Sequence, residues 1–102
     1  MSKIAIIDDD ASVRKSIALI LGAQGHSTKL FDDPKNFLAA ASITDFDLLI
    51  VDNNMPHMTG LELYEFLKTN NPEHPQFILM SGRLLEEEFP KYENSNKIQF
   101  LS

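Results

Sequence analysis

The sequence predicts an α/β fold in which a doubly wound, five-stranded parallel sheet carries helices on both faces. Short, continuous apolar runs recur along the chain, and such runs are typical of strands that are covered on both faces. Segments with apolar residues at helical spacing lie between these runs. Strands that alternate with helices in this way form parallel sheets, because each parallel connection needs a crossover. With 102 residues, 43% of them hydrophobic, the chain is expected to form one domain with a substantial core.

The first half of the chain contains two strands and two helices. Residues 3–8 contain a continuous apolar run at 4–7 that is rich in β-branched side chains, which predicts a strand in the centre of the sheet. Residues 10–21 form an amphipathic segment that begins at Asp10, a good helix N-cap. Residues 28–31 are strand-like, and an Asp-Pro pair then predicts a helix start that leads into residues 35–41.

The second half continues the alternation. A second strongly apolar run ends in Asp52, as the first run ends in Asp8. The predicted elements are a strand over residues 47–52, a helix over 61–69, strands over 76–80 and 98–101, and a weak helix within 83–96. These elements complete a sheet of five strands.

Composition excludes several classes of function. The formal net charge of −6 argues against direct binding of nucleic acid. The absence of cysteine excludes disulfides, iron–sulfur clusters and thiol chemistry. No stretch approaches the ~20 apolar residues of a membrane span, and the apolar run at residues 4–7 is cut off by Asp8, so it is no signal peptide. We expect a cytoplasmic protein that does not contact a membrane.

Acidic residues end two of the predicted central strands. Asp8 and Asp9 follow the first strand, and Asp52 ends the third. Because ligand sites in open α/β sheets lie at the carboxyl ends of the strands, three carboxylates meet if these strands are neighbours. Like charges at such a site raise one another's pKa unless a cation intervenes, and oxygen donors favour Mg²⁺. The alternative for such an acidic run is a solvated turn with a helix cap, which is how we interpret Asp10.

Four stretches resemble the receiver domain of bacterial two-component response regulators. They are Ile-Ile-Asp8-Asp9-Asp10 followed by Val13-Arg14, Leu-Leu-Ile-Val-Asp52-Asn-Asn54-Met-Pro56-His-Met-Thr-Gly60, Ile-Leu-Met-Ser81-Gly82, and Phe100-Leu-Ser. The resemblance extends over the whole chain, and its most specific part is the Asp-x-x-Met-Pro-x-x-x-Gly stretch. It implies one receiver domain over residues 1–102, with the flavodoxin-like strand order 2-1-3-4-5.

The resemblance also implies a function in phosphorelay signal transduction. Asp52 would accept a phosphoryl group from a histidine kinase, a phosphotransfer protein or a small donor such as acetyl phosphate. The implied Mg²⁺ ligands are the carboxylates of Asp9 and Asp52 and the main-chain carbonyl of Asn54, with Asp8 holding a metal-bound water. Ser81 would contact the phosphoryl group, and Phe100 would reorient with it. An output domain or partner protein would read the changed surface, so the module is regulatory, with at most self-catalysed phosphorylation and dephosphorylation.

The sequence departs from the family pattern at two places. The family's lysine and closing helix would follow residue 102, so we expect a receiver domain that is C-terminally incomplete, without its last helix. One sheet face would then be uncovered around the first and last strands, so we expect either that the chain is a fragment of a longer one or that a partner, such as a second copy, covers this face. Asn53 stands where an apolar residue is usual.

Two other functions remain open at this point. A pseudo-receiver would keep the acids and act as a protein interaction module without phosphorylation. A phosphatase with an aspartyl nucleophile, resembling the haloacid dehalogenase group, ranks last because that group needs an acid at the position of Asn54.

Other residues around the acids receive structural interpretations. Thr59 is interpreted as the cap of the following helix, and Met55 and Met58 as loop packing. The three histidines, His26, His57 and His74, are interpreted as scattered surface residues.

Overall fold

A computed structural model describes residues 2–40, 42–70, 73–80 and 98–101. The described strands form one parallel sheet in the order β2-β1-β3-β4-β5. The strands are β1 (Lys3–Ile7), β2 (Ser27–Phe31), β3 (Leu48–Asp52), β4 (Gln76–Met80) and β5 (Ile98–Leu101). The predicted order and the central position of the first strand are therefore confirmed. The weak helix predicted within 83–96 lies outside the described residues.

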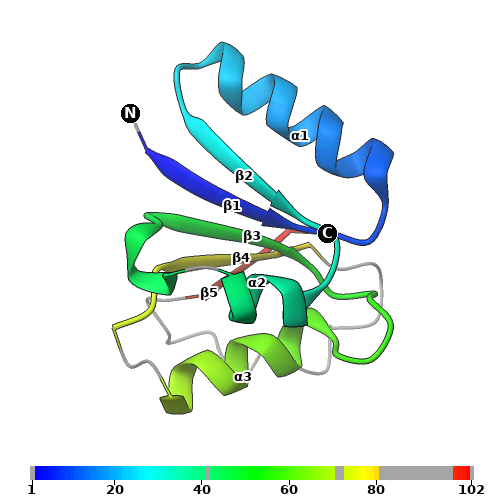
Figure 1. The fold of residues 1–102 in the computed structure, drawn as a ribbon, viewed down its shortest axis with the longest axis vertical. Coiled ribbons are helices and arrows are strands. Elements are labelled where there is room, and N and C mark those ends of the chain that lie inside the picture. The colour runs from blue at the N-terminus through cyan, green and yellow to red at the C-terminus, as the bar shows by residue number, and fades with distance from the viewer. Residues whose placement is uncertain (1, 41, 71–72, 81–97, 102) are drawn as a thin grey trace.

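Helices cover both faces of this sheet. Figure 1 shows α1 on one face and α2 and α3 on the other. The helices are α1 (Ala11–Ala23), α2 (Pro34–Ala40) and α3 (Gly60–Asn70), with a 3₁₀ turn at Ile43–Asp45. Each helix lies within two residues of its predicted bounds, because caps and prolines mark the starts. No helix in the described part of the chain has the length and hydrophobicity that a membrane span requires.

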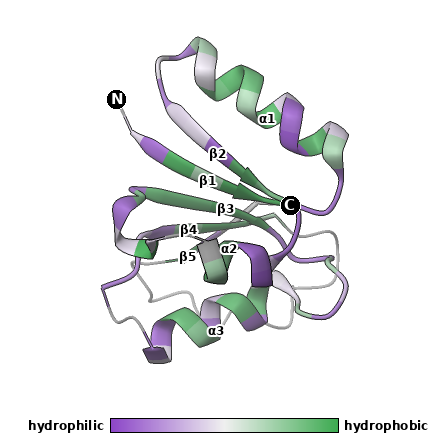
Figure 2. Ribbon diagram, viewed as in Figure 1, coloured by the Kyte–Doolittle hydropathy of each residue, from purple (hydrophilic) through white to green (hydrophobic). Residues whose placement is uncertain are grey.

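The larger core lies between the sheet and the pair α2 and α3. Three phenylalanines meet there at near-perpendicular or tilted angles, with ring centroids 5.2–6.4 Å apart: Phe31, Phe37 and Phe46. Tyr64 of α3 packs edge-on against Phe77 of β4 at 5.3 Å. Figure 2 shows the central strands mostly hydrophobic, whereas the helices have both hydrophobic and polar residues. This core fixes α3, and with it the loop that precedes α3, against the ends of β3 and β4.

The face under α1 has a smaller core. Ile4, Ile6 and Ile50 are buried there, whereas the side chains of Leu48, Ile78 and Met80 are partly exposed. The expected opening around the first strand is therefore wrong, because α1 covers β1 with Ile17, Ala18 and Leu21. The less covered residues lie on β3 and β4. On α1 itself, Leu19 and Ile20 are 77% and 60% exposed.

The interpretation of His74 as a surface residue is also wrong. Its side chain is 2% exposed and lies edge-on against the ring of Tyr64 at 5.5 Å. Its Nδ1 lies 2.8 Å from the carbonyl oxygen of Pro75, which can act only as an acceptor. The sequence places this histidine between two prolines, a context that suggests a loop, and only the packing of α3 on β4 encloses it. His57 is exposed and His26 is half-buried.

Candidate functional site

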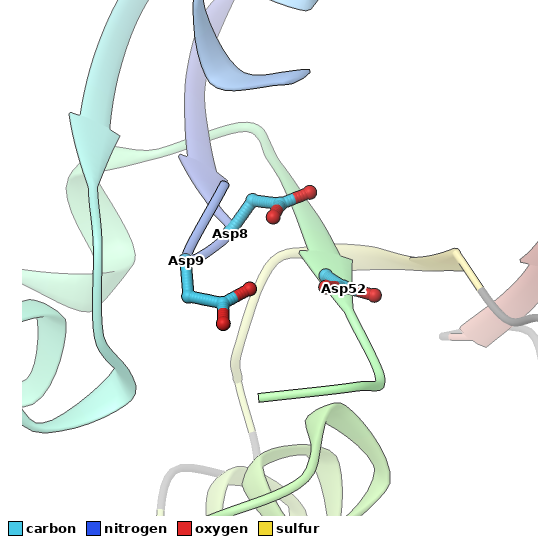
Figure 3. A group of neighbouring side chains, drawn as sticks. All are labelled: Asp8, Asp9 and Asp52. Atoms are coloured by element: carbon cyan, nitrogen blue, oxygen red, sulfur yellow. The ribbon is translucent and has the colours of Figure 1, made fainter. Parts of the chain in front are cut away.

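Three carboxylates gather at the carboxyl ends of β1 and β3. The two strands pair directly, with Ile7 opposite Val51, so Asp8 and Asp52 occupy the next position on adjacent strands. Asp9 follows Asp8, and Figure 3 shows the three side chains at the same edge of the sheet. One oxygen from each carboxylate lies within 4.8 Å of the others. The structure thus brings together the three acids expected to meet, with Asp8 buried (3% exposed), Asp52 half-buried and Asp9 exposed.

Hydrogen bonds hold Asp8 in the turn between β1 and α1. Its backbone N–H donates to the carbonyl of Phe31 at 3.1 Å, which extends the pairing of β1 with β2 by one residue. Its Oδ1 accepts from the backbone N–H of Asp10 at 2.9 Å, and its carbonyl accepts from Nη1 of Arg14 at 2.7 Å. Asp10 in turn caps α1 by accepting from the N–H groups of Ser12 and Val13. This confirms the interpretation of Asp10 as a helix cap.

The other side of the site is the end of β3. Oδ1 of Asp52 accepts from the backbone N–H of Asn54 at 3.1 Å, and the N–H of Asn53 donates to the carbonyl of Met80 at 2.9 Å. The loop then turns into α3 through a capping box, in which Oγ1 of Thr59 accepts from the N–H of Glu62 at 3.1 Å. Oε1 of Glu62 accepts from the N–H of Thr59 at 2.8 Å. The expected helix-capping role of Thr59 is confirmed, and Met55, which was interpreted as loop packing, is buried in the larger core.

The site repels negative charge in the absence of a cation. Burial raises the pKa of Asp8, and the charges of Asp52 and Asp9 raise it further. Burial also raises the pKa of Asp52, the charge of Asp9 adds to this, and hydrogen bonds from Asn54 and Asp8 oppose it. Both shifts reflect the cost of ionising a carboxyl that is buried and that also lies beside other carboxylates. A hard divalent cation with oxygen ligands removes that cost, so the donor set fits Mg²⁺.

This electrostatic cost predicts how stability depends on pH in metal-free solution. Because the pKa of Asp8 is raised in the folded state, that state binds more protons than the unfolded chain. The contribution of Asp8 to the free energy of unfolding therefore falls as the pH rises from the ordinary value of 3.8 through the raised pKa, and the loss is complete above it. Asp8→Asn keeps an oxygen that can accept from Asp10 and removes the charge. We expect this variant to be more stable at pH 7 by about 0.5–1 kcal/mol after screening by solvent, or roughly 2–8 °C in Tm.

Thermal unfolding of both proteins between pH 3 and pH 8 in a chelator measures this difference. The advantage of Asp8→Asn should shrink toward pH 3, where the native carboxyl is protonated and neutral. An advantage that is the same at both ends of the range would contradict the electrostatic cause.

The chain belongs to the response regulator receiver domain family, whose pattern matches residues 4–102. It is 35% identical over 79 residues to the transcriptional regulatory protein FixJ of Bradyrhizobium diazoefficiens, an alignment that covers 78% of this chain and 38% of FixJ. It is 45% identical over 67 residues to the transcriptional regulatory protein FlgR of Helicobacter pylori, covering 65% of this chain and 17% of FlgR. The chain thus spans less than two-fifths of the length of these curated relatives.

Solved structures show the same fold. The chemotaxis protein CheY4 of Vibrio cholerae superposes with a TM-score of 0.83 at 24% identity, covering 99% of this chain and 85% of that one. The response regulator TrrA of Thermotoga maritima gives 0.80 at 20% identity, covering 100% and 88%. Receiver domains are regulatory modules of two-component phosphorelay signalling rather than conventional enzymes.

The remaining predicted site residues fall at the limits of the described structure. Asn54 follows the end of β3 by two residues, is exposed, and donates its N–H to Asp52. Ser81 lies outside the described residues. The backbone of Phe100 lies in β5 opposite Leu79, and its side chain is outside the description.

Two residues beside the acids have partners that sequence reasoning did not assign. Arg14 lies on the first turn of α1, and its guanidinium reaches the Asp8 carbonyl. The sequence signal for this contact was the position of Arg14, a long cationic side chain six residues after Asp8 at the end of the first strand. Asn53 is buried, and its side chain bonds to the start of α3. The sequence marks Asn53 as unusual but does not show what it contacts.

Proposed function

We propose that this chain accepts a phosphoryl group on Asp52 in a Mg²⁺-dependent reaction and thereby switches a surface that another domain or protein reads. The observation that carries the proposal is the meeting of Asp8, Asp9 and Asp52 at the carboxyl ends of two adjacent central strands. Family membership supports it, and so does the DrrB receiver domain of Thermotoga maritima, 26% identical over the whole of this chain at a TM-score of 0.79, which was solved in a BeF₃-activated form.

Asp52 is the proposed nucleophile because it combines position with access. Its carboxylate is half-buried at the end of β3, and one oxygen is held by the N–H of Asn54. An oxygen of Asp52 would bond to phosphorus as the bond from phosphorus to the donor's imidazole nitrogen, or to the oxygen of acetyl phosphate, breaks. A bound cation would favour the ionised form of Asp52, and that carboxylate would then attack without a separate base.

The residues proposed to hold Mg²⁺ are Asp9, Asp52 and the main-chain carbonyl of Asn54, with Asp8 acting through water. Bound Mg²⁺ would supply neutralisation of charge on the phosphoryl oxygens. The burial of Asp8 and its bond to Asp10 suit a residue that keeps one orientation and does not face the donor directly. Ser81 is proposed to contact the phosphoryl group and Phe100 to reorient with it.

The proposed partners are a histidine kinase or phosphotransfer protein as donor and an output domain or separate protein as reader. We propose a cytoplasmic location and no direct contact with nucleic acid or membrane, in keeping with the net charge of −6. A second copy of the chain is a candidate to cover the partly exposed residues of β3 and β4 beside α1.

Acetyl phosphate tests the proposal without knowledge of the kinase. The chain is incubated with acetyl phosphate and Mg²⁺, and its intact mass is measured with and without a chelator. We expect a gain of one phosphoryl group that requires the metal, and fragmentation should place it on Asp52. No adduct under any condition, including with a range of histidine kinases, would favour the pseudo-receiver, and continuous turnover of phosphate monoesters would favour a phosphatase.

A further inference from the structure

Asn53 makes four hydrogen bonds just after the end of β3, and two of them connect it to the start of α3. Its N–H donates to the carbonyl of Met80 at 2.9 Å, and its own carbonyl accepts from the N–H groups of Met55 at 3.1 Å and Gly60 at 3.3 Å. Its side-chain Oδ1 accepts from the N–H of Leu61 at 3.0 Å. Asn53 is 8% exposed, and its side-chain bond to Leu61 is partly buried.

These bonds account for the first turn of α3. The first N–H groups of a helix have no partner within it. Asn53 accepts from two of them, on Gly60 and Leu61, and Thr59 accepts from the next, on Glu62. The helix thus has two caps of different origin. Thr59 directly precedes α3 in the sequence, whereas Asn53 directly follows β3, the strand that ends in Asp52.

Because peptide groups are planar, the position of Asn53 determines how the backbone groups next to Asp52 are oriented. The N–H of Asn54 points at Asp52, so the Asn53 carbonyl, which belongs to the same trans peptide, points the opposite way, toward Gly60 and Met55. In the next peptide, the N–H of Met55 points at the Asn53 carbonyl, so the carbonyl of Asn54 points away from it. Anchoring Asn53 on α3 therefore orients both the Asp52 carboxylate and the Asn54 carbonyl.

The helix is also too close to the strand end to shift freely. A Cβ at Gly60 would lie 2.7 Å from the carbonyl oxygen of Asp52 and 3.1 Å from Cα of Asn53. Between these two points the loop makes tight turns, with the N–H of Met58 donating to the carbonyl of Pro56 at 2.8 Å and His57 at a φ of 71°. The hydrogen bond from the N–H of Leu61 to the side chain of Asn53 joins the two ends of this loop.

We propose that Asn53 is a positioning residue for metal and phosphoryl binding, because its side chain holds the 52–54 backbone against α3. The proposal rests on the metal site given under the proposed function. It assigns a role to a residue that touches neither the metal nor the phosphoryl group.

The test compares the two caps of α3. Asn53→Ala and Thr59→Ala each remove one side-chain cap of α3, so both variants should unfold at a lower temperature than the native chain. Mg²⁺ titrated into each protein by calorimetry should bind about tenfold more weakly to Asn53→Ala, as is usual when a support behind metal ligands is lost. It should bind to Thr59→Ala within about twofold of the native affinity, because the 52–54 backbone keeps its bonds. Asn53→Asp keeps an accepting oxygen and should bind Mg²⁺ at least as tightly as the native chain.

Amide hydrogen exchange in metal-free protein gives a reading that does not depend on the metal. The N–H of Leu61, which donates to the Asn53 side chain, should lose protection in Asn53→Ala and keep it in Asn53→Asp. Native Mg²⁺ affinity in Asn53→Ala, or an equal loss in both alanine variants, would overturn the positioning role alone. Failure of the native chain itself to bind Mg²⁺ would instead overturn the proposed metal site, and the role of Asn53 with it.

Discussion

Gly60→Ala is expected to destabilise the protein by about 3 kcal/mol, the upper end of the usual cost of overpacking. The new methyl group would lie 2.5 Å from Cδ1 of Leu79 and 2.7 Å from the carbonyl oxygen of Asp52. Leu79 is fully buried and the carbonyl belongs to a central strand, so neither can move aside without disturbing the core. Thermal unfolding followed by circular dichroism should show a fall in Tm of at least roughly 10 °C.

Gly22→Ala is the matched control for this substitution. Gly22 also lies in a helix, α1, but a Cβ there meets no atom within 4 Å. Alanine is a better helix former by about 1 kcal/mol, so the control should raise Tm by a few degrees. Equal effects of the two substitutions would show that α3 does not approach the strand end as closely as the structure indicates.

Asp52→Asn is expected to abolish the phosphoryl adduct while making the metal-free protein slightly more stable. The amide cannot act as the carboxylate nucleophile, so adduct formation should fall below detection. Asparagine still offers Oδ1 to the N–H of Asn54, so the loop keeps its bond. Burial and the charge of Asp9 raise the pKa of the Asp52 carboxyl. Removing this carboxylate should therefore add about 0.5 kcal/mol to the free energy of unfolding after screening, or roughly 2–4 °C in Tm.

Intact mass after incubation with acetyl phosphate and Mg²⁺ gives the first reading, and thermal unfolding in a chelator gives the second. Asp45→Asn serves as the control, because it removes an exposed carboxylate outside the site. That variant should form the adduct at the native level with a native Tm. An adduct that persists in Asp52→Asn would place the acceptor elsewhere, whereas a lower Tm would mean that the charge of Asp52 stabilises the fold.

The fold was predictable because its signals are local. Buried parallel strands need continuous apolar runs such as residues 48–51, and Asp10 and Thr59 mark helix starts through hydrogen bonds to residues two or three positions away. The strand order came from the resemblance, since no local pattern states which strands pair. The meeting of Asp8, Asp9 and Asp52 followed once the first and third strands were taken as neighbours.

Only the tertiary structure decided the contacts between residues that are distant in sequence and the burial of residues that packing encloses. His74 looked like a loop residue until the packing of α3 on β4 buried it. Asn53 looked like an irregular substitution until its side chain was found on Leu61, eight residues further along the chain. The sequence by itself determined the elements and the acids at their ends, because hydrophobic pattern and strand-end position are properties of single segments. How firmly Asp52 is held depends on the distance between β3 and α3, which is set by side chains from several elements packing at once.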